Sequence, residues 1–297
     1  MISIERIRNN LEVLKSSLAL KGYNDDLNEI ISIDSDYRAS LSLVNDLRAE
    51  RNKVTDQIAE LKKSKQDAND KIVSMRALGS KIKDLESEIS VKKERLDDLI
   101  LNLPNVPHES VPPGSDESNN KVIYEWGVEK NQSFDIKNHL SLGSSLKLFD
   151  FERSAKLSGS GFPLYTGKGA LLERSLINFM LEIQTQKNDY LEIIPPFLVN
   201  SNSVLTTGNL PKFSEDMYHS EIDDMWLIPT AEVPLTNIHY NEILNQSDLP
   251  KKYTAFSACF RREAGSYGKD TKGFQRLHQF NKVELVQLVK PEESYKA

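Results

Sequence analysis

The stretch YTAFSACFRREAGSYGKDTKGFQRLHQFNKVELVQLV, residues 253–289, decides the fold class. Its two long apolar-rich runs, Tyr253–Glu263 and Phe274–Val289, lie on either side of a polar loop that contains glycine. This pattern predicts two strands joined as an antiparallel hairpin. One strong helix is predicted earlier in the chain, from Gly169 to about Gln186. Long antiparallel strands with one clear helix indicate an α+β fold and not a doubly wound parallel sheet.

Strand alternation sorts the side chains of this hairpin into two faces. On the first strand the odd-numbered residues share one face, namely Ser257, Cys259, Arg261 and Glu263. The opposite face carries Phe256 and Phe260, and we therefore expect it to be the buried face. On the second strand the even-numbered residues share a face: Arg276, His278, Phe280, Lys282 and Glu284.

If the two polar faces coincide, one surface carries Arg261, Glu263, Arg276, Phe280 and Glu284. Guanidinium groups bind phosphate or carboxylate, and a ring offers a stacking surface. Carboxylates accept hydrogen bonds from amines. The set suits a nucleotide together with an ammonium-bearing substrate. The alternative, an exposed face with ordinary cross-strand ion pairs, stays open on the residue pattern alone.

A second polar cluster lies in WLIPTAEVPLTN, residues 226–237. Thr230 and Glu232 share strand parity, between prolines that limit ordinary ladder pairing. A hydroxyl and a carboxylate two residues apart can hold the ammonium group of an amino acid. The alternative is that Thr-Ala-Glu only begins a helix as its N-cap.

The first hundred residues have a different pattern, in which glycine and proline are almost absent. Apolar residues recur in two series separated by the polar segment KKSKQDANDK, residues 62–71. Steps of three and four are typical of a coiled-coil seam. We therefore predict an antiparallel helical hairpin from about Leu27 to Leu103, with one shorter helix in residues 1–26 packed at its base. The two series are Leu41, Val44, Leu47, Val54, Ile58 and Leu61, then Ile72, Met75, Leu78, Ile82, Leu85, Ile89, Leu96, Leu99 and Leu103.

The predicted hairpin is more basic than the rest of the chain. Residues 48–95 carry thirteen cations against nine anions, a net charge of +4, whereas the whole chain carries −6. Two interpretations are open: the lysines keep a solvated coiled coil soluble, or they belong to an arm that lies along a phosphate backbone. Periodicity does not separate these two interpretations.

Composition excludes several classes of protein. Cys259 is the single cysteine of the 297 residues, so a disulfide framework and a cysteine-based zinc site are excluded. The N-terminal residues lack the apolar core of a signal peptide, and no run reaches the ~18 apolar residues of a membrane span. We expect a cytoplasmic protein. The histidines show no metal-ligand spacing among themselves: His108, His139, His219, His239 and His278.

Taken in order, these segments resemble the seryl-tRNA synthetase family of class II aminoacyl-tRNA synthetases. The motifs that carry the resemblance are GALLERSLINFM…YLEIIPPF, KLSGSGF, TGNLPKF, PTAEVPLTN, FRREAGSYGKDTKGF and RLHQFNKVE, behind a long helical hairpin. The resemblance implies a tRNA-binding arm over residues 1–103, a linker over 104–120 and a class II catalytic domain over 121–297. It also implies an antiparallel sheet with flanking helices.

The resemblance also implies roles for individual residues. Arg261 and Arg276 are expected to be catalytic, with Arg261 bridging the α-phosphate of ATP and the carboxylate of serine. ATP is expected to bind Arg261, Arg262, Glu263, Leu277 and Phe280, with Phe280 stacked on adenine. Serine is expected to bind Thr230, Ala231, Glu232, Arg261 and Glu284. The loop Ala264–Gly273 is expected to cover ATP, and the resemblance assigns no metal ligand within this chain.

The implied reaction attaches L-serine to serine tRNA through a seryl-adenylate, with ATP and Mg²⁺, in a homodimer. Selenocysteine tRNA is a further expected acceptor. The family's third motif is not found in residues 1–297, so we expect this polypeptide alone not to aminoacylate. The alternatives are another class II amino-acid ligase and a non-catalytic coiled-coil protein with a synthetase-derived domain.

Overall fold

The computed structural model describes residues 2–114, 116–128, 132–263 and 273–297. It divides into two compact units, residues 1–127 and 128–297. No helix in the described ranges is both long and apolar enough to span a membrane.

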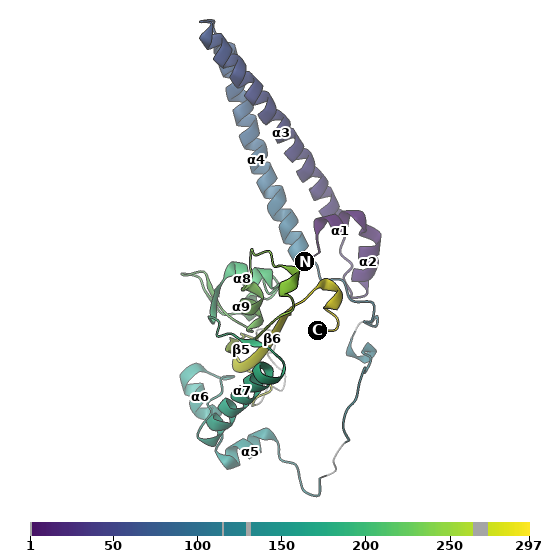
Figure 1. Cartoon of the computed structure of the whole chain (residues 1–297), viewed down its shortest axis with the longest axis vertical. Helices are drawn as coiled ribbons and strands as arrows, with labels where there is room; N and C mark the ends of the chain where they lie inside the picture. Colours follow the sequence, from purple (N-terminus) through teal and green to yellow (C-terminus); the bar gives the residue numbers. More distant parts are fainter. Residues whose placement is uncertain (1, 115, 129–131, 264–272) are drawn as a thin grey trace. The chain divides into compact units, whose positions relative to one another are not determined.

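The first unit is dominated by two long helices that lie side by side, α3 (Asn28–Lys63) and α4 (Asn69–Leu101), as Figure 1 shows. The prediction of an antiparallel hairpin is confirmed, and the chain reverses within the polar segment at residues 64–68. The predicted seam forms the contact between the helices. Its buried members include Val44, Leu47 and Ile82 in one cluster, and Val54 and Ile58 in another.

Polar contacts across the two helices select one register of this hairpin. The Arg48 guanidinium lies 2.7 Å from the Glu86 carboxylate, and Lys92 donates a 2.9 Å hydrogen bond to the Ser40 hydroxyl. The charged pair is about half exposed, so it adds little stability. A sliding register would break these contacts together with the apolar seam.

The base of the hairpin contains two short helices, α1 (Ile4–Asn9) and α2 (Leu11–Ala19). The prediction of one helix here was wrong, because Asn10 has φ −136° and ψ 37°, outside the helical region. The break lets both short helices pack on the ends of α3 and α4. They share one core, whose members include Ile7, Leu14, Leu18, Leu27, Ile30 and Leu96.

A buried carboxylate joins α1 to α3 at this base. Asp34 is 3% exposed, and its Oδ2 atom lies 2.9 Å from Arg8 and 3.0 Å from Arg38. A buried charge is costly unless it is paired, so the two arginines are needed where Asp34 is enclosed.

The second unit is built around the predicted strand hairpin. Strands β5 (Lys251–Phe260) and β6 (Gln279–Leu288) are antiparallel, with Cys259 opposite Phe280 and Ala255 opposite Glu284. Strand β1 (Leu191–Glu192) extends this sheet by pairing with β5 in parallel. The expected antiparallel strand pair is thus the main part of this sheet, and β1 adds a short parallel pairing at its edge.

A smaller antiparallel sheet is formed by strands that lie between β1 and β5 along the chain. Its strands are β2 (Leu198–Asn200), β4 (Met225–Leu227) and β3 (His219–Ser220), in that order. The predicted long helix is α7 (Lys168–Lys187), and it contacts β5 and β6. The expectation of one clear helix missed four shorter ones: α5 (His139–Leu146), α6 (Phe151–Ser158), α8 (Ser201–Thr206) and α9 (Glu232–Asn237).

The buried face of β5 is the opposite of the predicted one. Ser257 and Cys259 are fully buried, whereas Phe256 and Phe260 are only half-buried. The reason is tertiary packing, because the segment at the start of α9 covers the odd-numbered face. Ala231 and Leu235 form a core with Tyr253 and Ala255 of β5. Small side chains on that face let the helix approach closely.

Candidate active site

The strand hairpin places Arg261 directly after β5, next to the strand face that carries Phe280 and Glu284. The Arg261 backbone N–H donates a 2.9 Å hydrogen bond to the His278 carbonyl, which continues the pairing beyond the last strand residue. The Arg261 guanidinium carbon lies 5.1 Å from the centre of the Phe280 ring, and Nε donates to the Pro229 carbonyl at 3.4 Å. The prediction that the two polar faces coincide is confirmed by the strand register.

A cavity of about 310 Å³ opens beside these residues. It brings together Thr230, Arg261 and Glu263, three of the residues that the sequence pointed to. The remaining lining residues come from the segment before β3 and from the segment just after β4: Asn209, Phe213, Asp216, Met217 and Pro229. The volume suits part of a small ligand, and the wall offers one guanidinium group, carboxylates and a hydroxyl.

Glu263 and Arg276 form an ion pair at the rim of this cavity. Both lie outside the strands, and Glu263 has a φ of 53°, so strand parity does not describe them. The Glu263 side chain is 19% exposed and the Arg276 side chain is 42% exposed. The structure therefore brings the two predicted residues together through a turn.

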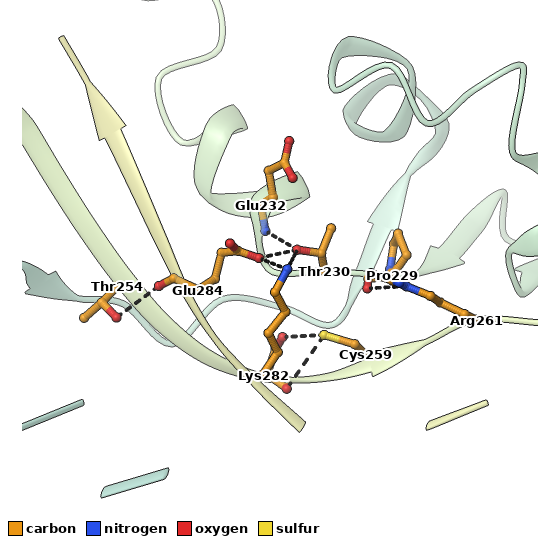
Figure 2. Close-up of polar contacts among 9 residues, drawn as sticks. Pro229, Thr230, Glu232, Thr254, Cys259, Arg261, Lys282 and Glu284 are labelled. Atoms are coloured by element: carbon orange, nitrogen blue, oxygen red, sulfur yellow. Dashed lines mark hydrogen bonds and ion pairs between the residues drawn. The ribbon is translucent and has the colours of Figure 1, made fainter. Parts of the chain in front are cut away.

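Three side chains make a closed polar cluster next to the cavity (Figure 2). The Thr230 hydroxyl donates to the Glu284 carboxylate, and the Lys282 ammonium lies 2.5 Å from the same carboxylate. Lys282 also donates to the Thr230 hydroxyl at 3.1 Å. Lys282 and Glu284 are two residues apart on β6, so their side chains point to the same face.

Glu232 does not join this cluster through its carboxylate. It is the first residue of α9, is exposed, and points away from Thr230 in Figure 2. Its backbone N–H donates to the Thr230 hydroxyl at 3.2 Å. The strand parity proposed for Thr230 and Glu232 was wrong. The alternative of a helix start is closer, although Ala231, fully buried, is the N-cap residue.

The remaining predicted residues contribute main chain or lie at the surface. Leu277 is 8% exposed, so its side chain belongs to the core. Arg262 is exposed, and its backbone N–H donates a 2.7 Å hydrogen bond to the Asp216 carbonyl. That bond attaches the end of β5 to a residue that lines the cavity. The loop predicted to cover ATP, Ala264–Gly273, lies outside the described residues except for Gly273.

Lys282 and the cavity residues before β3 had no predicted role. For Asn209 and Phe213 the signal was present, because they belong to the TGNLPKF motif. For Lys282 the signal was its strand parity with Phe280 and Glu284. Asp216 and Met217 carried no signal, because they reach the cavity through an irregular segment.

The buried thiol beneath the cluster is not a reactive group. Burial raises the pKa of the Cys259 thiol, which therefore stays protonated near neutral pH. Among the described residues, no group of three or more His, Cys, Asp or Glu side chains could hold a metal ion. Arg261 and Arg276 offer positive charge at this site, and Thr230 and the carboxylates offer hydrogen-bonding groups.

Comparison with known proteins first defines the class. Residues 213–297 match the family model of the tRNA synthetase class II core domain (G, H, P, S and T). Residues 1–107 match the model of the seryl-tRNA synthetase N-terminal domain. The helical hairpin lies within the second of these matches, and the residues that line the cavity, apart from Asn209, lie within the first.

Individual relatives define the family. The serine–tRNA ligase of Syntrophobacter fumaroxidans is 48% identical over 99% of this chain and 70% of its own length. That of Listeria welshimeri is 48% identical over 100% of this chain and 70% of its own. The crystal structure of seryl-tRNA synthetase from Pyrococcus horikoshii complexed with ATP has a TM-score of 0.86 and 36% identity, covering 100% of this chain and 71% of that one. This chain belongs to the seryl-tRNA synthetase family.

Proposed function

We propose that this chain carries the amino-acid and ATP sites of a serine–tRNA ligase, which attaches L-serine to serine tRNA through a seryl-adenylate. The observation that carries the proposal is the shared wall of Thr230, Arg261 and Glu263 in one cavity, with Glu284 bonded to Thr230. The family relationship supports the same conclusion, and the Pyrococcus relative was crystallised with ATP.

Each part of the substrate has a chemical partner at this site. The ammonium of serine binds Thr230 and Glu284, and its carboxylate binds Arg261. Arg261 also contacts the α-phosphate of ATP, and Arg276 supplies further positive charge. Adenine stacks on Phe280. The adenine amino group donates to the Glu263 carboxylate, and the edge of the base contacts the backbone at Leu277. Mg²⁺ accompanies ATP, because phosphate oxygens and water supply most of its ligands in such sites.

The reaction needs positioning and charge stabilisation, and no covalent nucleophile from the protein. The serine carboxylate attacks the α-phosphorus in line, and pyrophosphate leaves with the electrons of the broken bond. Arg261 neutralises charge that develops between the two reactants. The terminal ribose hydroxyl of the tRNA then takes the seryl group and releases AMP. The placement of Arg261 next to Thr230 supports a short distance between carboxylate and phosphate.

The long hairpin is proposed to bind tRNA through its phosphates, as the arm formed by residues 1–103. Residues 104–120 are the linker and residues 121–297 the catalytic domain in this proposal. Support comes from the net charge of +4 over residues 48–95 and from exposed lysines at the turn, Lys62, Lys63 and Lys65. Selenocysteine tRNA is a further proposed acceptor of serine. We also propose that the protein acts in the cytoplasm.

A homodimer is proposed on the exposed apolar face of α7. Leu172, Leu176 and Phe179 follow helical spacing and are 53%, 46% and 59% exposed. A stripe of this kind on a long helix is typical of a surface that another chain covers. A second copy of this chain is the proposed partner.

The substrate is tested by calorimetric titration of the 297-residue chain with non-hydrolysable aminoacyl-adenylate analogues. We expect the seryl analogue to bind at least about tenfold more tightly than the alanyl analogue, because a lost hydroxyl leaves polar groups of the site unpaired. The threonyl analogue should also bind more weakly, since its extra methyl group needs additional room. Equal binding of all three would exclude serine specificity. Tighter binding of another analogue would indicate a different class II ligase.

A further inference from the structure

The Thr230 hydroxyl has no free position for another hydrogen bond. A hydroxyl offers one O–H donor and two acceptor lone pairs. Thr230 donates to the Glu284 carboxylate, and it accepts from the Glu232 backbone N–H at 3.2 Å and from the Lys282 ammonium at 3.1 Å. The residue is 6% exposed. A ligand ammonium that binds this oxygen must therefore replace one of the three partners.

Lys282 is the partner that can leave. The Glu232 N–H belongs to the backbone at the start of α9, and Glu284 is anchored on β6, where its carbonyl accepts a 3.0 Å bond from Thr254. The Lys282 ammonium is attached through a flexible four-carbon stem, and its side chain is 35% exposed. It can turn into solvent without moving the backbone.

We propose that Lys282 is a built-in occupant of the substrate-ammonium site, which serine displaces when it binds. The inference rests on the proposed function, which gives the ammonium of serine to Thr230 and Glu284. Lys282 holds those same two groups, and it is also a primary ammonium with three donors. Lys282 is thus a positioning residue that keeps Thr230 and Glu284 oriented towards a cation before the substrate arrives.

The exchange selects for ligands that carry an ammonium group. The Glu284 side chain is only 16% exposed, so it needs a nearby cation. A ligand with its own ammonium replaces the one that leaves. A ligand without an ammonium would leave Glu284 unpaired if it displaced Lys282, so Lys282 stays on Glu284 when such a ligand binds. The affinity of acids that lack the α-amino group therefore does not depend on the exchange.

Removing the Lys282 charge should tighten the binding of amino ligands. In the Lys282→Met chain, we expect the seryl-adenylate analogue to bind about three- to tenfold more tightly, because no protein cation has to be displaced. The analogue that lacks the α-amino group should change by less than about twofold, because it gains no ion pair. Lys282→Arg keeps a cation and should stay close to the wild type. Lys252→Met is the matched control, since Lys252 lies at the other end of the hairpin.

Both dissociation constants are measured by calorimetric titration, and the melting temperature of each chain is measured with and without ligand. The melting temperature of the free Lys282→Met chain should be lower than that of the free wild type. The increase in melting temperature on binding the seryl analogue should be larger for Lys282→Met than for the wild type. Lys282→Gln supplies a second neutral variant with the same expectation if the methionine variant does not fold.

Two outcomes overturn the inference, and they are distinguishable from a failure of the proposed function. Equal weakening of both analogues in Lys282→Met would show that Lys282 contacts the ligand or only supports the fold. Unchanged binding of the seryl analogue would show that no exchange takes place. If the wild-type chain prefers the seryl analogue in either case, the proposed function survives. If the wild type binds neither analogue, both proposals fail.

Discussion

The Thr230 hydroxyl connects an anion and a cation at the edge of the cavity. It donates to Glu284 and accepts from Lys282, and the Glu232 N–H fills its other lone pair. A polar group that is this enclosed contributes through orientation as well as through bond strength. Its position at the start of α9 fixes the group to a backbone that also supplies the buried Ala231 and Leu235.

Replacing this hydroxyl by a methyl group should weaken substrate binding. We expect Thr230→Val to reduce the affinity for the seryl-adenylate analogue by about ten- to 100-fold, since each lost hydrogen bond to a charged group costs ~1.5–3 kcal/mol. Calorimetric titration measures the change. Thr236→Val, at an exposed position of α9, is the control and should bind as the wild type does. Affinities that fall equally in both variants would contradict the role of Thr230.

At this scale the sequence predicted the hairpin residues better than the others. Arg261, Phe280 and Glu284 were placed on one side by strand alternation, because long paired strands have a fixed side-chain period. Alternation did not show which face the rest of the chain covers, and so Phe256 and Phe260 were assigned to the wrong one. The prediction that the Glu232 carboxylate lies beside Thr230 was wrong for another reason, since a helix begins at Glu232 where a strand was assumed.

The helical arm shows which features of an element can be predicted locally. Its seam, its turn and its approximate ends follow from apolar spacing and from the polar residues 62–71. The break at Asn10 was not visible, because the polar residues around it suit a helix surface. The parallel pairing of β1 was also not visible, since it depends on a partner about sixty residues away.

The cations at the turn of the arm give a test of its proposed role. We expect Lys62→Ala combined with Lys63→Ala to weaken the binding of serine tRNA. The slope of the logarithm of the binding constant against the logarithm of the salt concentration should become shallower by up to about two units, because fewer phosphate contacts release fewer counterions. Filter binding over a series of salt concentrations measures both quantities. Lys137→Ala combined with Lys296→Ala removes two exposed cations from the other unit and should change neither. An unchanged salt slope in the arm variant would indicate that the turn lies outside the tRNA contact.

The whole molecule combines two units whose family counterparts are known separately. Residues 1–107 match the N-terminal domain of seryl-tRNA synthetases, and residues 213–297 match the class II core. The chain spans about 70% of the length of its curated relatives. Ligand-binding experiments on residues 1–297 test the described cavity directly.

The most direct measurement is a crystal structure of the chain with the non-hydrolysable seryl-adenylate analogue. We expect the ligand ammonium to contact Thr230 and Glu284, the group that replaces the α-phosphate to lie beside Arg261, and adenine to stack on Phe280. The Lys282 ammonium should have left Thr230. A ligand bound outside this cavity, or one whose ammonium contacts neither Thr230 nor Glu284, would contradict the proposed serine site.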